Sequence, residues 1–220
     1  MNKQLNPRQI KTIQNFWTWF QDNEQAIYNA CKLEINKDEV FFHLERNLNY
    51  VSKRIEYLIT KHPQNENKFK VFITAHGYRK LFPKMKELQE KAPILNFFSI
   101  QVYITPLNLE IQTLPNDLLE AIQNTQIKLE DYNIASKKII LTLYCPEIDW
   151  KMNKKRLKSH AYLLLLFTLG EIKYKRHIKD FNCELIHQNT YGLLSLSELP
   201  EFIDYLAKIN YSRKLKVFFH

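Results

Sequence analysis

Two neighbouring segments near the start of the chain repeat their apolar residues at alternating steps of three and four, as amphipathic helices do. The first segment, residues 7–32, follows a capping Asn6 and carries Ile10, Ile13, Trp17, Phe20, Ile27 and Cys31. The second, residues 37–61, carries Phe41, Leu44, Leu48, Val51, Ile55 and Leu58. Asn36 and Glu39 resemble a capping box at its start. Two matching stripes with a short joint predict an antiparallel helical hairpin.

Beyond residue 64, short runs rich in aromatic and β-branched residues alternate with helical patterns. The expected strands are 69–76, 97–105, 109–113, 127–135, 137–145, 181–188 and 214–219. The expected helices are 78–92, 115–124, 153–169 and 197–209, and Gly170 is the expected C-terminal stop of the third. Because several strands follow one another without an intervening helix, we expect a mixed or antiparallel sheet with packed helices. The chain is therefore predicted to be α+β.

The length of 220 residues allows one large core, and one or two domains are both compatible with it. We expect a single α+β domain over residues 1–220. The alternative is a helical-hairpin subdomain, 1–64, followed by an α/β part, 65–220, with the polar residues 65–68 as the boundary.

Glycine scarcity excludes several function classes, since only 3 of the 220 residues are glycine. The glycine loops that hold nucleotide phosphates need several closely spaced glycines, and none is present. No two histidines stand three or four apart on an expected helix, and no HExxH motif occurs. The sequence therefore predicts no metal site and no cofactor. No GxSxG motif or cysteine signature is present either, so an enzyme is uncertain and disfavoured.

The cysteines and the hydropathy pattern indicate a compartment. The three cysteines form no CxxC pair and are an odd set, which is typical of reduced thiols in the cytoplasm. The most apolar run, residues 161–170, is far shorter than the roughly 20 residues a membrane-spanning helix needs. The polar N-terminus shows no apolar signal core. We therefore expect a soluble cytoplasmic protein without membrane contact.

The net charge of +9 raises the question of a nucleic-acid partner. The excess is spread evenly, because residues 1–110 carry 16 basic and 11 acidic side chains and residues 111–220 carry 16 and 12. Two local clusters stand out, 151–158 and 173–179. Their candidate anion-binding side chains are Lys154, Lys155, Arg156, Lys158, Lys175 and Arg176. Solvated lysines on a basic protein are the favoured reading, since no nucleic-acid module is recognised.

Two further residues occupy positions that are common in sites. His76 ends an expected strand, where Gly77 allows an unusual backbone, and strand ends often carry function in α/β structures. Glu171 follows Gly170 at a helix C-terminus, where the helix dipole disfavours a carboxylate. For His76 a turn residue without a task is favoured. For Glu171 we favour a side chain that points into water or pairs with a base such as Lys173 or Lys175.

The stretch FWTWFQDNEQAIYNA, residues 16–30, contains both core residues and exceptions. On a helical projection Trp17 and Phe20 fall on the apolar face, so we expect them in the core. Trp19 falls well off that face and needs another packing element, a partner or a groove. Glu24 falls inside the stripe, where a carboxylate is costly unless it is paired. We expect it to meet a base from the second helix, a tyrosine or backbone donors.

Several short motifs resemble uncharacterised bacterial proteins: an FWxWFxxNE helix, a strand-turn like ITAHG, a KAP stop and a late GE. The residues that carry them are Phe16, Trp17, Trp19, Phe20, Asn23, Glu24, Ala75, Gly77, Ala92, Pro93, Gly170 and Glu171. The resemblance spans about residues 17 to 171, and it implies no activity.

The function that these patterns favour is a non-catalytic cytoplasmic protein-interaction module. Its partner is another protein or a second copy of the chain, contacted through Trp19. One alternative is nucleic-acid or polyanion binding through 151–158 and 173–179. The other is a hydrolase or transferase whose site gathers Glu24, His76 and Glu171 from distant segments.

Overall fold

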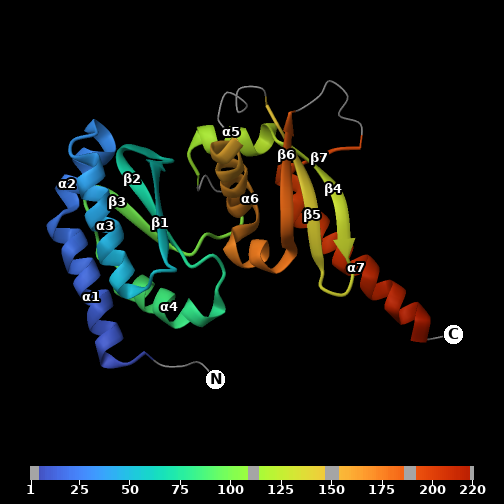
Figure 1. Cartoon of the computed structure of the whole chain (residues 1–220), viewed down its shortest axis with the longest axis horizontal. Helices are drawn as coiled ribbons and strands as arrows, with labels where there is room; N and C mark the ends of the chain where they lie inside the picture. The colour runs from blue at the N-terminus through green and yellow to red at the C-terminus, as the bar shows by residue number, and fades with distance from the viewer. Residues whose placement is uncertain (1–4, 109–113, 147–153, 186–191, 219–220) are drawn as a thin grey trace. The chain divides into compact units, whose positions relative to one another are not determined.

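The computed structural model describes residues 5–108, 114–146, 154–185 and 192–218, without the side chains of Lys154 and of 210–218. The chain divides into two compact units, Met1–Ile104 and Thr105–His220 (Figure 1). Each unit contains helices and a mixed sheet, of order β1-β2-β3 in the first and β6-β5-β4-β7 in the second. The predicted α+β class, with helices preceding a mixed sheet, is confirmed.

The first unit opens with two helices where the sequence predicted one. Helix α1 (Pro7–Asp22) starts at a capping box in which Asn6 and Gln9 bond each other's backbone. Helix α2 (Glu24–Leu33) follows after Asn23, whose φ of −107° and ψ of 10° interrupt the helical backbone. The apolar stripe continues across the break, which explains why the spacing alone did not reveal it.

The second predicted helix is too long. Helix α3 (Lys37–Val51) ends at Ser52, which is extended with φ −171°, and strand β1 (Glu56–His62) follows. The predicted helical positions Ile55 and Leu58 therefore lie before and within β1. Their segment is rich in β-branched and aromatic residues, and pairing with the next strand satisfies its backbone groups. The predicted capping box is also wrong, because Asn36 is left-handed and makes no side-chain cap.

The first sheet combines a hairpin with a helical crossover. Strand β2 (Asn65–Thr74) is antiparallel to β1, so the polar residues 65–68 lie in a hairpin. The division between the two units falls later, after Ile104. A 3-10 turn η1 (Arg79–Leu81) and helix α4 (Phe82–Glu90) lead to β3 (Phe98–Val102), which is parallel to β2. Helices α1, α2 and α3 cover one face of this sheet (Figure 1). Their buried contacts with it form the core, which includes the predicted core residues Trp17 and Phe20.

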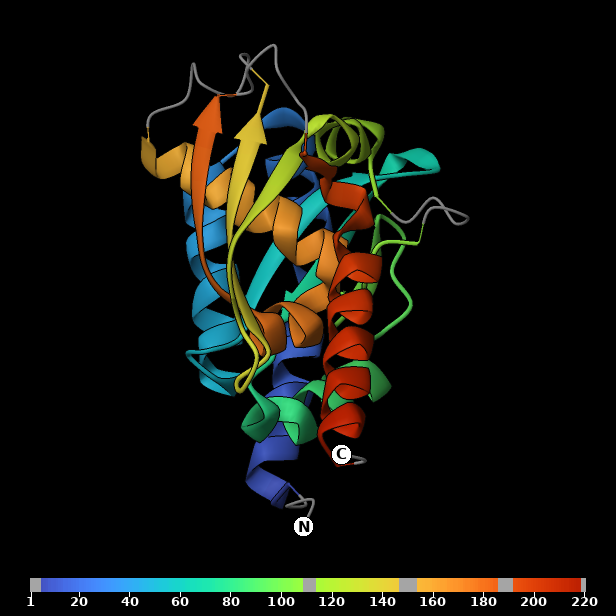
Figure 2. The ribbon, with the colours of Figure 1, turned by 90° about the vertical axis from the view of Figure 1, so that its right-hand side faces the viewer.

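The second unit is built on a predicted hairpin. After α5 (Asn116–Asn124), strands β4 (Gln126–Asn133) and β5 (Lys138–Cys145) pair antiparallel, as expected. Helix α6 (Lys154–His177) then returns the chain to β6 (Ile178–Leu185), which is parallel to β5 (Figure 2). The short β7 (Leu194–Ser195) pairs with β4, and η3 (Leu196–Glu198) leads into α7 (Leu199–Phe218).

Two predictions for the second unit concern where helices end, and one of them is wrong. The apolar helix stops at Gly170 as predicted, because its φ of 68° and ψ of 155° are not helical, and a second helical stretch of α6 follows to His177. The predicted strand 214–219 is helical as far as Phe218, since no glycine or proline follows Pro200 to stop α7. The apolar half of α6 is in the core as predicted, with residues 164–169 all buried. The predicted strand 109–113 lies outside the described residues.

Candidate functional site

Glu24 has the partner that its buried position requires. Its side chain keeps only 8% of its accessible surface, and its Oε1 accepts a hydrogen bond of 2.7 Å from the backbone N–H of Phe97. Phe97 precedes β3, and its carbonyl accepts from the N–H of Phe69 on β2. The carboxylate therefore joins the N-terminus of α2, where negative charge is favourable, to the sheet. The prediction of a backbone donor is confirmed, and the contact gives Glu24 a structural role.

The two tryptophans of α1 serve different purposes. Trp17 is 3% exposed and its indole N–H donates to the carbonyl of Leu88, 3.1 Å away, so it anchors α1 to α4. Trp19 packs against the core with part of its surface and stays partly exposed. It lines a pocket between the α1–α2 junction and the start of α3. Of the three alternatives expected for Trp19, the structure shows two, packing against the core and a place in the lining of a groove, and a partner stays a prediction.

The pocket has a volume of about 370 Å³, near the lower end of the roughly 300–1,000 Å³ range of ligand pockets. Its lining residues are Trp19, Asn23, Ala26, Asn36, Glu39, Val40 and His43. Asn23 shapes the α1 side, because both its backbone N–H and its side-chain Nδ2 donate to the Trp19 carbonyl, at 3.1 and 2.8 Å. Asn23, at the break between α1 and α2, lines one side of the pocket. Asn36, whose backbone is left-handed before α3, lines the other side.

The segment that lines the pocket is acidic within a basic protein. Residues 19–43 hold five acidic residues and two lysines, a net charge of −3 in a chain of net charge +9. Both lysines have partners, since Lys37 lies 2.7 Å from Glu34 and Lys32 donates to Tyr28 at 2.8 Å. The bond to Lys37 lowers the pKa of Glu34. Within the described residues Glu39 has no ion-pair partner.

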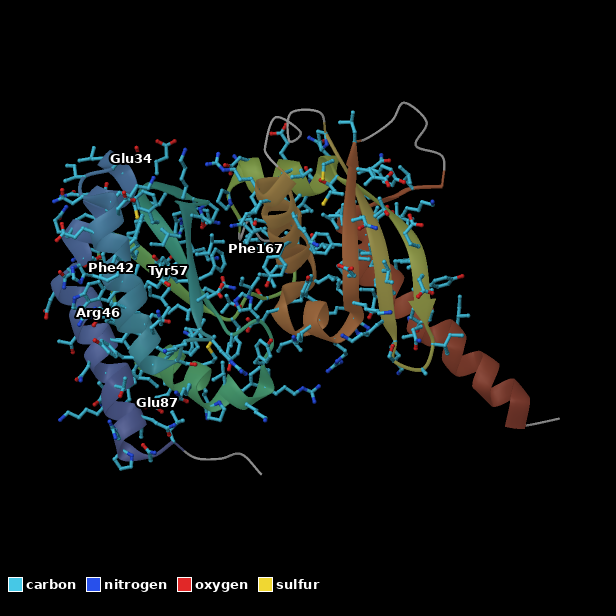
Figure 3. All side chains as sticks on the ribbon, in the orientation of Figure 1. Glu34, Phe42, Arg46, Tyr57, Glu87 and Phe167 are labelled. Atoms are coloured by element: carbon cyan, nitrogen blue, oxygen red, sulfur yellow. The ribbon has the colours of Figure 1, made fainter. Side chains whose placement is uncertain are left out.

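Exposed apolar side chains adjoin the pocket. Phe42 on α3 is 61% exposed and its ring lies 5.5 Å from that of His43, a pocket residue. Along the same helix, Arg46 Nε donates to the Tyr50 hydroxyl at 3.0 Å, and Tyr50 is also exposed. Figure 3 shows Phe42 and Arg46 on the helical layer. The sequence stripe identified only the inner face of α3, so this outer face was not predicted.

His76 is held in a specific geometry at the end of β2. Its φ is +50° and Gly77 follows with φ +68°, so the chain turns sharply here. The imidazole Nε2 lies 3.0 Å from Oε2 of Glu56 on β1, and the backbone N–H of His76 donates to Thr74 Oγ1. The Glu56 carboxylate is 68% exposed, so water weakens this attraction.

The three residues of the predicted composite catalytic site come from both units, and the two in the first unit are not neighbours. Glu24 is bonded to Phe97, which pairs with Phe69 of β2, whereas His76 follows the far end of β2 at Thr74. At roughly 3.3 Å per residue, the strand between Phe69 and Thr74 spans about 17 Å, which keeps Glu24 and His76 apart. Glu171 belongs to the second unit.

Glu171 is buried with no exposed surface, directly after the kink at Gly170. Of the two expected alternatives, a side chain that points into water is wrong, and pairing with a base stays a prediction. Lys173, one predicted partner, lies 2.9 Å from Asp204 and donates to the Pro200 carbonyl, which joins α6 to α7. The second half of α6 is thus fixed by packing and by bonds to α7.

The basic clusters stand at opposite ends of α6 (Figure 1). Residues 151–153 and the Lys154 side chain lie outside the described part. The exposed members are Lys155, Arg156 and Lys158 at one end and Lys175 and Arg176 at the other. The straight part of α6, 154–169, rises about 24 Å at roughly 1.5 Å per residue. The two clusters therefore do not merge into one patch along the helix.

In the described ranges, no three histidine, cysteine or acidic side chains come close enough to share a metal ion. Nor does any helix in those ranges combine the length and apolar character needed to cross a bilayer. Comparison of the chain with models of known protein families, with curated proteins and with solved structures found no match.

Proposed function

We propose that the chain is a non-catalytic protein-interaction module that binds a protein partner through the outer face of the helices in the first unit. The observation that carries this proposal is the pocket containing the partly exposed Trp19, beside the exposed ring of Phe42. Aromatic side chains in or next to pockets supply much of the affinity of protein interfaces. Two further apolar side chains at the α2–α3 connection, Leu33 and Ile35, are 60% and 50% exposed.

The proposal accounts for features that packing does not require. The α1 tryptophan that the core needs is Trp17, which is buried and hydrogen-bonded, whereas Trp19 contributes only part of its surface to the core. We place the protein in the cytoplasm, where the free thiols of Cys31, Cys145 and Cys183 would stay reduced.

The test is an affinity capture from cells with quantitative mass spectrometry, comparing wild type with Trp19→Ala and Phe42→Ala. Tyr205→Ala is the matched control, because Tyr205 is 57% exposed and belongs to the second unit. We expect at least one protein to be depleted about tenfold with both first-unit variants and retained with the control. The purified pair should then bind directly, and size-exclusion chromatography decides whether the partner is a second copy. Captured proteins that do not change with either variant would refute the proposal.

Polyanion binding is the second candidate, favoured by the exposure of Lys155, Arg156 and Lys158 on the first turns of α6. Binding of a labelled single-stranded oligonucleotide should then weaken steeply between 50 and 200 mM salt. Replacing these three side chains with glutamine should abolish it. No binding at 50 mM salt would eliminate this candidate.

A further inference from the structure

The pocket beside Trp19 has a chemistry that selects its occupant. An aromatic ring and a carboxylate without an ion-pair partner, Trp19 and Glu39, line the same opening. An aromatic face attracts cations, tryptophan most strongly, and a carboxylate accepts charged hydrogen bonds from lysine and arginine. The Asn23 amide oxygen makes no hydrogen bond within the described residues, so it offers a further acceptor.

The surrounding charge has the same sign as Glu39. The lining segment has a net charge of −3, and its two lysines are engaged by Glu34 and Tyr28. Neighbouring Asp22 and Asp38 are exposed and have no ion-pair partner within the described part of the chain. The potential at the opening therefore attracts a cation and repels an anion.

The size of the pocket limits what enters it. A volume of about 370 Å³ suits one long side chain, not a folded element. The apolar surface beside the opening, Phe42, suits the chain on either side of the inserted residue.

We propose that the occupant of the pocket is a lysine or arginine side chain of the partner protein, with its cationic head between the Trp19 ring and the Glu39 carboxylate. The proposal rests on the proposed function and specifies the partner's chemistry at the same site. The aliphatic stem of the inserted lysine or arginine lies along Val40, and apolar neighbours in the partner contact Phe42. The partner segment is therefore basic and apolar.

The experiment is an NMR titration of the full chain, labelled with 15N, that follows the indole N–H signals. The probes are four capped tripeptides, acetyl-Ala-X-Ala-amide, in which X is arginine, lysine, norleucine or glutamate. Trp17 is an internal control, because its N–H is buried and bonded to Leu88. Trp19→Phe and Trp17→Phe variants identify their signals among the three indole N–H signals of the chain, the third belonging to Trp150.

We expect the arginine and lysine peptides to shift the Trp19 signal with a Kd on the order of 1 mM, as suits a single anchored side chain. The norleucine and glutamate peptides should bind at least tenfold more weakly, and the Trp17 signal should stay in place. Glu39→Gln should weaken the arginine peptide about tenfold. The matched control Asp38→Asn removes the same charge from a neighbouring residue that does not line the pocket, and it should weaken binding less than twofold.

Three results would overturn the inference: no shift with either cationic peptide, equal binding of the norleucine or glutamate peptide, or equal losses in Glu39→Gln and Asp38→Asn. Inorganic phosphate is the probe of opposite charge, an anion. A Trp19 shift with phosphate alone would assign the pocket to an anion at the α3 N-terminus, and would also overturn it. If the cationic peptides fail but a partner is still lost with Trp19→Ala, the proposed function stands without this occupant.

Discussion

Removal of the Glu24 carboxylate should destabilise the first unit by an amount that its contacts allow us to work out. Glu24→Ala leaves the Phe97 N–H without its acceptor at a part-buried position. An unsatisfied backbone donor costs about 1–3 kcal/mol, and loss of an acidic residue at a helix N-terminus about 0.3–1 kcal/mol. We therefore expect the free energy of unfolding to fall by about 1.3–4 kcal/mol. Glu24→Gln keeps an acceptor oxygen and should cost about 1 kcal/mol.

The assay is urea unfolding followed by tryptophan fluorescence in a Trp150→Phe background, since Trp17 and Trp19 belong to the first unit and Trp150 to the second. With a slope of about 2 kcal/mol per molar urea, the Glu24→Ala midpoint should fall by about 0.7–2 M. Asp22→Ala is the control, because Asp22 is exposed and its loss should change stability by less than about 0.5 kcal/mol. Equal midpoints for Glu24→Ala and Asp22→Ala would refute the reasoning that the Phe97 contact stabilises the fold.

Three further predictions concern single positions. Gly170→Ala should destabilise the second unit by about 2–4 kcal/mol in urea unfolding, because a Cβ would lie 2.7 Å from Pro106 Cδ at a φ of +68°. Gly192→Ala, with φ +81° and no atom within 4 Å, should cost only about 1 kcal/mol, and equal costs would contradict the packing argument. Burial raises the pKa of Cys31 to about 11, so peptide mapping should find slower alkylation at pH 8 than for a free cysteine. Burial, and secondarily Arg176 and Lys173, lowers the pKa of His177 despite its bond to the Lys137 carbonyl. Because the unfolded state then binds the proton more readily, stability should fall as pH drops from 7 to 5, and His177→Gln should reduce this slope.

The sequence predicted those parts of the fold that depend on local pattern. The stripe of α1 placed Trp17 and Phe20 in the core, and the β4–β5 hairpin followed from two adjacent strand-like runs. The same reasoning failed where the apolar spacing fits a helix but the segment pairs as a strand. Ile55 and Leu58 continue the helical spacing of α3, but strand pairing with β2 determines the backbone of Leu58. Gly170 was expected to end a helix, and its backbone does interrupt α6, but the further helical stretch to His177 was not expected.

The candidate site was predicted only in part, because a pocket depends on how helices pack. Helical projection showed that Trp19 leaves the core face and that Glu24 needs a partner. It did not show that the partner is Phe97, 73 residues away, nor that α3 supplies the opposite wall of the pocket through Glu39. One usable signal was present in the sequence. The local charge of residues 19–43 differs in sign from that of the chain, and comparison of the two halves averages it away.

The most direct test of the account is site-specific photo-crosslinking in living cells. A photoreactive phenylalanine analogue replaces Phe42 beside the pocket or, as the control, Tyr205 in the second unit, both of which are exposed. The account predicts a discrete crosslinked product from position 42, lost on adding Trp19→Ala and absent from position 205. No product from position 42, or one that persists with Trp19→Ala, would contradict the claim that the helical face of the first unit is the binding surface.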